Sequence, residues 1–153
     1  MNEHDFFPDP DQLACECLGS LPRQVEEGLK LFNAGQYFEA HEVLEIAWRA
    51  ESRPVRELYR GILQVGVGFY HITRGNFSGA HKLFQRAYRW LQPFPAFCQG
   101  IHLDPFRHKI LEIDSILVDE LPSPSLERLQ RLFFRIDYES PQPGEQDDQS
   151  IAL

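Results

Sequence analysis

The sequence predicts an all-α fold of about six helices, in which two stacked helical hairpins are completed by two further helices. Apolar residues recur at spacings of three and four along residues 21–136, with almost no strand-like alternation. Glycine and proline mark the ends of these apolar segments. A pattern of eight residues also recurs after 40 positions. With 42% hydrophobic and 25% charged residues, the 153-residue chain has the composition of one globular domain.

The first hairpin is expected at the start of the helical region. Pro22 suits the first position of a helix over 22–34, and Gly35 suits the position after its end. A second helix over about 36–51 ends before Pro54. A short turn at the glycine therefore joins two antiparallel helices.

The second hairpin follows directly. A helix over about 55–74 is apolar on almost every side, which is typical of a central, buried helix. Asn76 then caps a helix over about 77–92, which stops before Pro93.

Two further helices are expected after a loop. Asp104 and Pro105 form a cap and a first-turn residue for a helix that extends to about residue 120. Ser123 or Ser125 begins a sixth helix, which continues through Arg135.

Both ends of the chain differ from the middle, because each carries five acidic residues and no Lys or Arg. We assign residues 1–20 to a loosely ordered acidic arm, which its apolar residues could anchor or fold into a short helix. Residues 21–136 are assigned to a single helical domain and residues 137–153 to a disordered acidic tail.

A basic segment lies in the middle of this acidic chain. Residues 49–89 hold eight Arg or Lys but only two Glu, although the net charge of the whole chain is −8. The segment is either a site for an acidic ligand or a set of solvated helix faces. A nucleic-acid partner is not expected, because the isoelectric point of about 5.2 lies far below the basic range of such proteins.

The 40-residue repeat has a direct physical meaning. In each copy a glycine ends one helix, an aromatic residue packs under the turn, and two alanines let neighbouring helices approach closely. The spacing is similar to that of tetratricopeptide repeats, which recur after 34 residues rather than 40. The residues Gly35, Tyr37, Ala40, His41, Leu44, Ala47, Trp48 and Arg49 recur as Gly75, Phe77, Ala80, His81, Phe84, Ala87, Tyr88 and Arg89.

The second helix carries polar residues beside its buried face. At 100° per residue, His41, Glu45 and Trp48 lie along one flank. Glu42 points away from this flank and needs a partner from elsewhere.

The third helix carries a complementary stripe, and its glycines permit close approach of a neighbour. The members of this stripe are Gly61, Gln64, Gly68 and His71. Because buried polar side chains need hydrogen-bonding partners, we predict that four polar groups converge between the second and third helices. These groups belong to His41, Glu45, Gln64 and His71.

Three interpretations of this convergence stay open. The first is a hydrogen-bond network that fixes the two helices in register. The second is a divalent-metal site with His41, Glu45 and His71 as ligands and Glu42 as a further one. The third is general acid–base catalysis by His41 with Glu45. Apart from the metal, no cofactor is expected.

The other histidines give weaker evidence of a functional site. His81 and His102 have no carboxylate at helical spacing, and His108 has only Glu112, which is typical of a surface pair.

The cysteines and the absence of a leader predict a cytoplasmic protein. Cys15, Cys17 and Cys98 are an odd number in a chain without an export signal, so we expect free thiols. No apolar run is long enough to span a membrane, and no membrane partner is expected.

Several of these residues belong to a recognisable motif. The stretch from Phe32 to Trp48 matches F-N-x-x-x-Y-F-E-A-H-E-x-L-E-x-x-W, residues 61–64 match G-h-h-Q, where h is apolar, and residues 76–80 match N-x-x-G-A. Over residues 25–92 the chain therefore resembles the family catalogued as domain of unknown function 309, small all-helical proteins of bacteria, archaea and plastids. The resemblance implies an all-α fold with the motif on adjacent helices, and it brings no established activity.

We therefore expect a cytoplasmic or plastid-stromal binding module whose partner is a small acidic ligand or a protein segment. Phe38 and Ile46, on the outer face of the second helix, could meet the terminal helices or a second subunit in a homodimer. Whether the protein is an enzyme stays open, and the alternative is a metal-dependent or acid–base enzyme, a hydrolase, centred on His41 and Glu45. The expected ligand-binding residues are His41, Glu42, Glu45, Trp48, Arg56, Arg60, Gln64 and His71.

Overall fold

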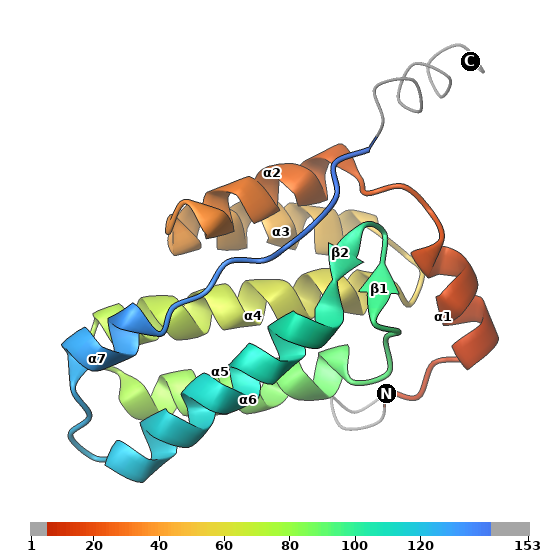
Figure 1. Ribbon diagram of the computed structural model, residues 1–153. Coiled ribbons are helices and arrows are strands. Elements are labelled where there is room, and N and C mark those ends of the chain that lie inside the picture. The colour runs from red at the N-terminus through yellow and green to blue at the C-terminus, as the bar shows by residue number, and fades with distance from the viewer. Residues whose placement is uncertain (1–5, 142–153) are drawn as a thin grey trace.

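The computed structural model describes residues 6–141, and within this range it is a bundle of seven helices with one short hairpin (Figure 1). Residues 1–5 of the predicted arm and residues 142–153 of the predicted tail lie outside the described range. The elements are α1 (Pro10–Cys17), α2 (Arg23–Asn33), α3 (Tyr37–Ala50), α4 (Arg56–Thr73), α5 (Phe77–Leu91), β1 (Phe97–Cys98), β2 (Ile101–His102), α6 (Leu103–Glu120) and α7 (Leu126–Arg131).

The predicted all-α class is confirmed, and α2 to α6 begin and end within two residues of the expected positions. The sixth predicted helix is shorter than expected. Ser125 caps it by accepting a hydrogen bond from the backbone N–H of Arg128, but helix α7 ends at Arg131. The chain then extends because Phe133 and Phe134 both pack on Phe69, with ring centroids 4.3 and 5.1 Å away.

The two hairpins, α2–α3 and α4–α5, lie side by side in Figure 1, and their turns are nearly identical. Gly35 and Gly75 have φ angles of +78° and +77°, a left-handed conformation that favours glycine. In each turn the residue after the glycine donates its N–H to a carbonyl of the preceding helix. The distance is 2.9 Å for Gln36 and 2.8 Å for Asn76. These equivalent closures confirm that the 40-residue pattern marks two copies of one hairpin.

Helix α4 is the central element, as its apolar sequence predicted, and it packs between α3 and α5. Two of its three glycines, Gly61 and Gly68, lie against α5 rather than against α3. A Cβ atom on Gly61 would lie 2.7 Å from the Leu91 side chain, and one on Gly68 would lie 2.5 Å from the Phe84 ring. No helix in the described range is long and apolar enough to cross a membrane.

The segment after α7 runs back along the bundle, between α2 and α6, toward the β-hairpin (Figure 1). Asn33 holds this segment through both groups of its amide, donating to the carbonyl of Ile136 at 3.0 Å and accepting from its N–H at 2.7 Å. Tyr138 then forms a bridge with Ile101, and Glu139 donates its N–H to Gly100. The part of the predicted tail over 137–139 is therefore paired with the hairpin.

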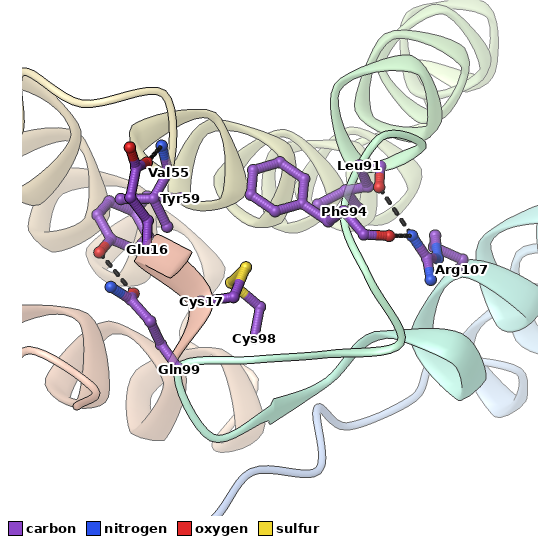
Figure 2. Close-up of a disulfide and its surroundings, with 9 residues drawn as sticks. All are labelled: Glu16, Cys17, Val55, Tyr59, Leu91, Phe94, Cys98, Gln99 and Arg107. Atoms are coloured by element: carbon purple, nitrogen blue, oxygen red, sulfur yellow. Dashed lines mark hydrogen bonds between the residues drawn. A yellow bond between two sulfur atoms is a disulfide. The ribbon is translucent and has the colours of Figure 1, made fainter. Parts of the chain in front are cut away.

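A disulfide between Cys17 and Cys98 joins α1 to β1, across a sequence separation of 81 residues (Figure 2). The prediction of three free thiols is wrong for these two residues, and only Cys15 is an exposed free thiol among them. The sequence could not show the pairing, because the fold alone brings the two distant segments together.

Polar contacts reinforce the disulfide, so α1 is packed rather than loosely held (Figure 2). The buried carboxylate of Glu16 accepts the backbone N–H of Val55 at 2.9 Å, which links α1 to the start of α4. The Tyr59 hydroxyl donates to Gln99 at 2.7 Å, and the N–H of Gln99 donates to the carbonyl of Cys17 at 2.8 Å. Residues 6–20 of the predicted arm are therefore anchored to the bundle, and they include the short helix α1.

Candidate functional site

The predicted polar residues lie on the face formed by α3 and α4. On α3, Nε2 of His41 lies 3.7 Å from Oε2 of Glu45, and each side chain is about one-third exposed. Glu45 also accepts a 2.8 Å hydrogen bond from Arg49, while Glu42 is exposed. The pair is therefore a half-exposed surface arrangement and not a closed, buried network.

The corresponding residues of α4 find different environments. His71 faces its own C-terminal turn, where Nδ1 lies 3.4 Å from the Asn76 amide. The side-chain oxygen of Gln64 is buried and has no hydrogen-bond partner. Among residues 6–141, no hydrogen bond or ion pair joins either residue to His41 or Glu45.

The predicted four-residue convergence is therefore not formed as a single network. The reason lies in the orientation of α4, because Gly61 and Gly68 pack on α5 and the stripe that they share with Gln64 and His71 is therefore directed toward α5 rather than toward α3. Within the described part of the chain, no three His, Cys, Asp or Glu residues form a group that could hold a metal ion. His41, Glu45 and His71 thus do not provide a metal-ligand set in this geometry.

A second group on the same face is much more tightly organised. The guanidinium carbons of Arg56 and Arg60 both lie 4.4 Å from the centroid of the Trp48 indole ring. Arg60 also lies 4.3 Å from the ring of Trp90 on α5. The three neighbouring helices α3, α4 and α5 therefore each contribute to one stack of indoles and guanidinium groups, which we call the Trp–Arg cluster (Trp48, Arg56, Arg60 and Trp90).

Each guanidinium in the Trp–Arg cluster is fixed through its Nε atom. Nε of Arg56 donates to the carbonyl of Trp48 at 3.1 Å, and Nε of Arg60 lies 2.9 Å from Oε2 of Glu57. The outer Nη atoms of both arginines make no hydrogen bond with another described residue. Stacking thus holds the planes in place while leaving the Nη edges available.

Glu57 is buried beneath the Trp–Arg cluster, with only 7% of its surface exposed. Burial raises the pKa of its carboxyl, although Arg60, the indole N–H of Trp48 and Arg56 oppose this effect. The indole N–H and Oε2 are close enough to influence each other, yet neither makes a hydrogen bond of good geometry. Buried polar atoms without a hydrogen bond are uncommon in folded proteins, and two of them meet here beside the guanidinium of Arg60.

Comparison with known proteins matches the part of this face that α3 and α4 form to a family. Residues 25–83 match the family described as "Domain of unknown function (DUF309)". The resemblance to this family over the motif-bearing helices is therefore confirmed.

Two similar curated proteins have no described activity. The chain is 32% identical over 106 residues to the uncharacterized protein YpuF of Bacillus subtilis (strain 168), a match that covers 68% of the chain and 60% of YpuF. It is 23% identical over 90 residues to an uncharacterized protein of Aquifex aeolicus (strain VF5), covering 58% of the chain and 27% of that protein. The matched region thus spans less than two thirds of either relative.

The DUF309 segment contains Trp48, Arg56 and Arg60 but not Trp90, which lies beyond residue 83. Trp90 is not among the residues that the sequence predicts for the site. Its only signal is an aromatic residue near the end of α5, and that does not reveal that the ring reaches back to Arg60. Only the packing of α4 on α5 brings the two together.

A second missed feature is a histidine–carboxylate pair that joins α5 of the DUF309 segment to α6. Nδ1 of His81 lies 2.8 Å from Oδ1 of Asp114, and both side chains are mostly buried. Burial raises the pKa of Asp114, and the hydrogen bond from His81 opposes the increase. The 40-residue repeat aligns His81 with His41, but its carboxylate comes from 33 positions downstream, so helical spacing could not identify it.

Proposed function

We propose that this protein is a binding module that uses the Trp–Arg cluster to hold a small acidic ligand. The observation that carries the proposal is the pair of stacked guanidinium groups, whose Nε atoms are fixed and whose Nη edges make no hydrogen bond with another described residue. Carboxylate and phosphate groups are the ligands whose geometry matches such an edge.

Preorganisation supports this choice over a merely solvated surface. A free arginine side chain loses rotamer freedom when it binds an anion, which weakens the interaction. Here stacking on Trp48 and the contacts of each Nε have already ordered Arg56 and Arg60. The side chain of Arg60 is only 20% exposed, so its charge is screened less than that of a typical surface arginine.

The local charge also favours an anion. Two guanidinium groups face a single carboxylate, Glu57, and burial disfavours its ionised form. The adjoining Arg49 and Arg53 are already paired, with Glu45 and Glu51 respectively. The Trp–Arg cluster therefore carries an excess of positive charge within an acidic protein.

The other expected ligand-binding residues lie farther along the same face. Glu45 is one turn from Trp48 on α3, and His41 is one turn farther. Gln64 follows Arg60 by one turn on α4. These residues would bound the ligand on one side, whereas His71 and Glu42 are more distant. The cytoplasmic or plastid location, the absence of a nucleic-acid partner and a homodimer stay predictions.

The experiment is a thermal-shift and calorimetric titration of the full chain with inorganic phosphate, citrate and succinate at 20 mM NaCl. We expect at least one of these anions to raise the melting temperature and to bind stoichiometrically. Arg56→Gln or Arg60→Gln should weaken that binding about tenfold or more, because a hydrogen bond to a charged group contributes roughly 1.5–3 kcal/mol.

The matched control is Arg86→Gln, since Arg86 is an exposed arginine on α5 within the same basic segment. This variant removes one positive charge without touching the Trp–Arg cluster. If Arg86→Gln weakens anion binding as much as Arg60→Gln does, only the net charge matters and the proposed site is wrong. Equal melting temperatures of the unliganded variants would show that the fold is intact.

A further inference from the structure

We propose that the acidic segment over residues 1–5 binds the Trp–Arg cluster of its own chain and competes there with an external anion. The inference rests on the proposed function, because it names a regulator of the same site. The segment lies outside the described range, and its sequence supplies two carboxylates, Glu3 and Asp5.

The described chain begins in contact with the Trp–Arg cluster. The ring centroid of Phe6 lies 5.5 Å from that of Trp90, and the guanidinium carbon of Arg60 lies 4.3 Å from the centroid of the same indole. The ring of Phe94 supports Phe6 from a distance of 6.5 Å. The segment that precedes Phe6 therefore starts beside the proposed anion site.

The residues that follow Phe6 fix this starting point. Helix α1 begins four residues later, at Pro10. The Cys17–Cys98 disulfide holds α1 against β1, and the bond from Val55 to Glu16 holds it against the start of α4. A group on a short tether has an effective concentration in the millimolar range. A carboxylate in the segment thus competes well with a dissolved anion of modest affinity.

The length of the segment suits the spacing of its targets. Asp5 directly precedes Phe6, whereas the backbone of Glu3 can lie up to about 10 Å from that of Phe6 in an extended chain. The guanidinium groups of Arg56 and Arg60 each lie 4.4 Å from the Trp48 ring. The two carboxylates can therefore reach the two arginines together.

Charge complementarity favours this occupant. Two carboxylates match two guanidinium groups whose Nη atoms make no hydrogen bond with another described residue. The acidic segment at the other end of the chain is placed differently, because it follows Tyr138, which is bridged to Ile101 beside the β-hairpin. The segment over residues 1–5 instead precedes a residue that touches the cluster itself.

The test is calorimetric titration of the full chain with citrate and with inorganic phosphate at 20 mM NaCl. The variant that combines Glu3→Gln and Asp5→Asn should bind these anions about threefold to tenfold more tightly than the unaltered protein, because the anion no longer has to displace the segment. Addition of Arg60→Gln to both proteins should abolish this difference.

The matched control combines Asp147→Asn and Asp148→Asn, which removes the same two charges near the other end of the chain. Its affinity for the anions should stay within about twofold of the unaltered protein. An equal gain in both double variants would mean that only net charge matters. A larger gain in the control would identify the other acidic segment as the occupant. Either result overturns the proposal.

A second measurement needs no external anion. Without added ligand, neutralisation of Glu3 and Asp5 should shift the side-chain Nε–H resonances of Arg56 and Arg60 in nuclear magnetic resonance spectra, and the control should not. If these resonances shift but no anion binds to any variant, the proposed function fails and the contact of the segment stands. If anions bind and Arg60→Gln weakens them, but neutralisation changes neither affinity nor resonances, the proposed function stands and this inference is wrong.

Discussion

Removal of the Cys17–Cys98 disulfide should lower the stability of the protein substantially. The bond closes a loop of 81 residues that contains α2 to α5 and with them the whole of the DUF309 segment. Its main effect is on the unfolded chain, whose freedom the closed loop restricts. Cys98→Ala is the suitable change, since Cys98 is fully buried and a serine there would add an unpaired hydroxyl.

The magnitude follows from the loop length. The chain-entropy relation gives about 4.5 kcal/mol for a loop of this size at 25 °C, and native disulfides in small domains contribute roughly 2–5 kcal/mol. For a chain of this length, each kcal/mol corresponds to about 2–4 °C in melting temperature. We therefore expect Cys98→Ala to melt roughly 9–18 °C below the unaltered protein.

The assay is urea unfolding followed by far-ultraviolet circular dichroism, with and without dithiothreitol. The reductant should move the midpoint of the unaltered protein toward that of Cys98→Ala and should leave Cys98→Ala itself unchanged. Cys15→Ala is the control, because Cys15 is an exposed free thiol and its removal should change the free energy of unfolding by less than about 0.5 kcal/mol. Equal midpoints for Cys98→Ala and Cys15→Ala, or no response to the reductant, would refute the reasoning.

Three other substitutions test the packing and the electrostatics. Glu57→Gln should make the protein as stable as the unaltered chain, or more stable, at pH 7. Because the pKa of Glu57 is raised in the folded protein, the unaltered chain loses stability as the pH rises from about 4.5 through the folded pKa. The variant should lack this loss in urea titrations between pH 4 and 8. Asn33→Ala should cost roughly 1–3 kcal/mol in urea unfolding, since it leaves the N–H and carbonyl of Ile136 without their partners; a loss below about 0.5 kcal/mol would mean that water replaces the amide. Gly68→Ala should destabilise the protein by about 1–3 kcal/mol in calorimetry, because the added Cβ would meet the Phe84 ring at 2.5 Å. This effect should outweigh the better helix propensity of alanine. A stabilised variant would show that the ring moves aside.

Most of the helical framework is encoded locally. Pro22, Gly35 and Asn76 act through the chain near them, by fixing a φ angle, permitting a left-handed turn or capping a helix N–H group. Such effects need no distant partner. The sequence accordingly places α2 to α6 with good accuracy. The expected cap by Asp104 is wrong, because α6 already begins at Leu103 and Asp104 pairs with Arg107 inside the first turn.

The candidate site was only partly accessible from the sequence. Trp48, Arg56 and Arg60 were expected to take part in ligand binding, and the structure brings these three together. The expected meeting of His41 and Glu45 with residues of α4 does not occur. Periodicity shows that residues share a stripe, but it does not show which of two neighbouring helices the stripe faces.

The amino-acid sequence by itself determined the helices, the turns between them and the duplicated hairpin, because backbone sterics and hydrophobic periodicity act over a few residues. The tertiary structure alone decided that Cys17 meets Cys98, that His81 meets Asp114 and that Trp90 covers Arg60. These contacts join elements that are 30 to 81 positions apart. Their formation depends on how whole helices pack, and no local pattern of residues specifies that geometry.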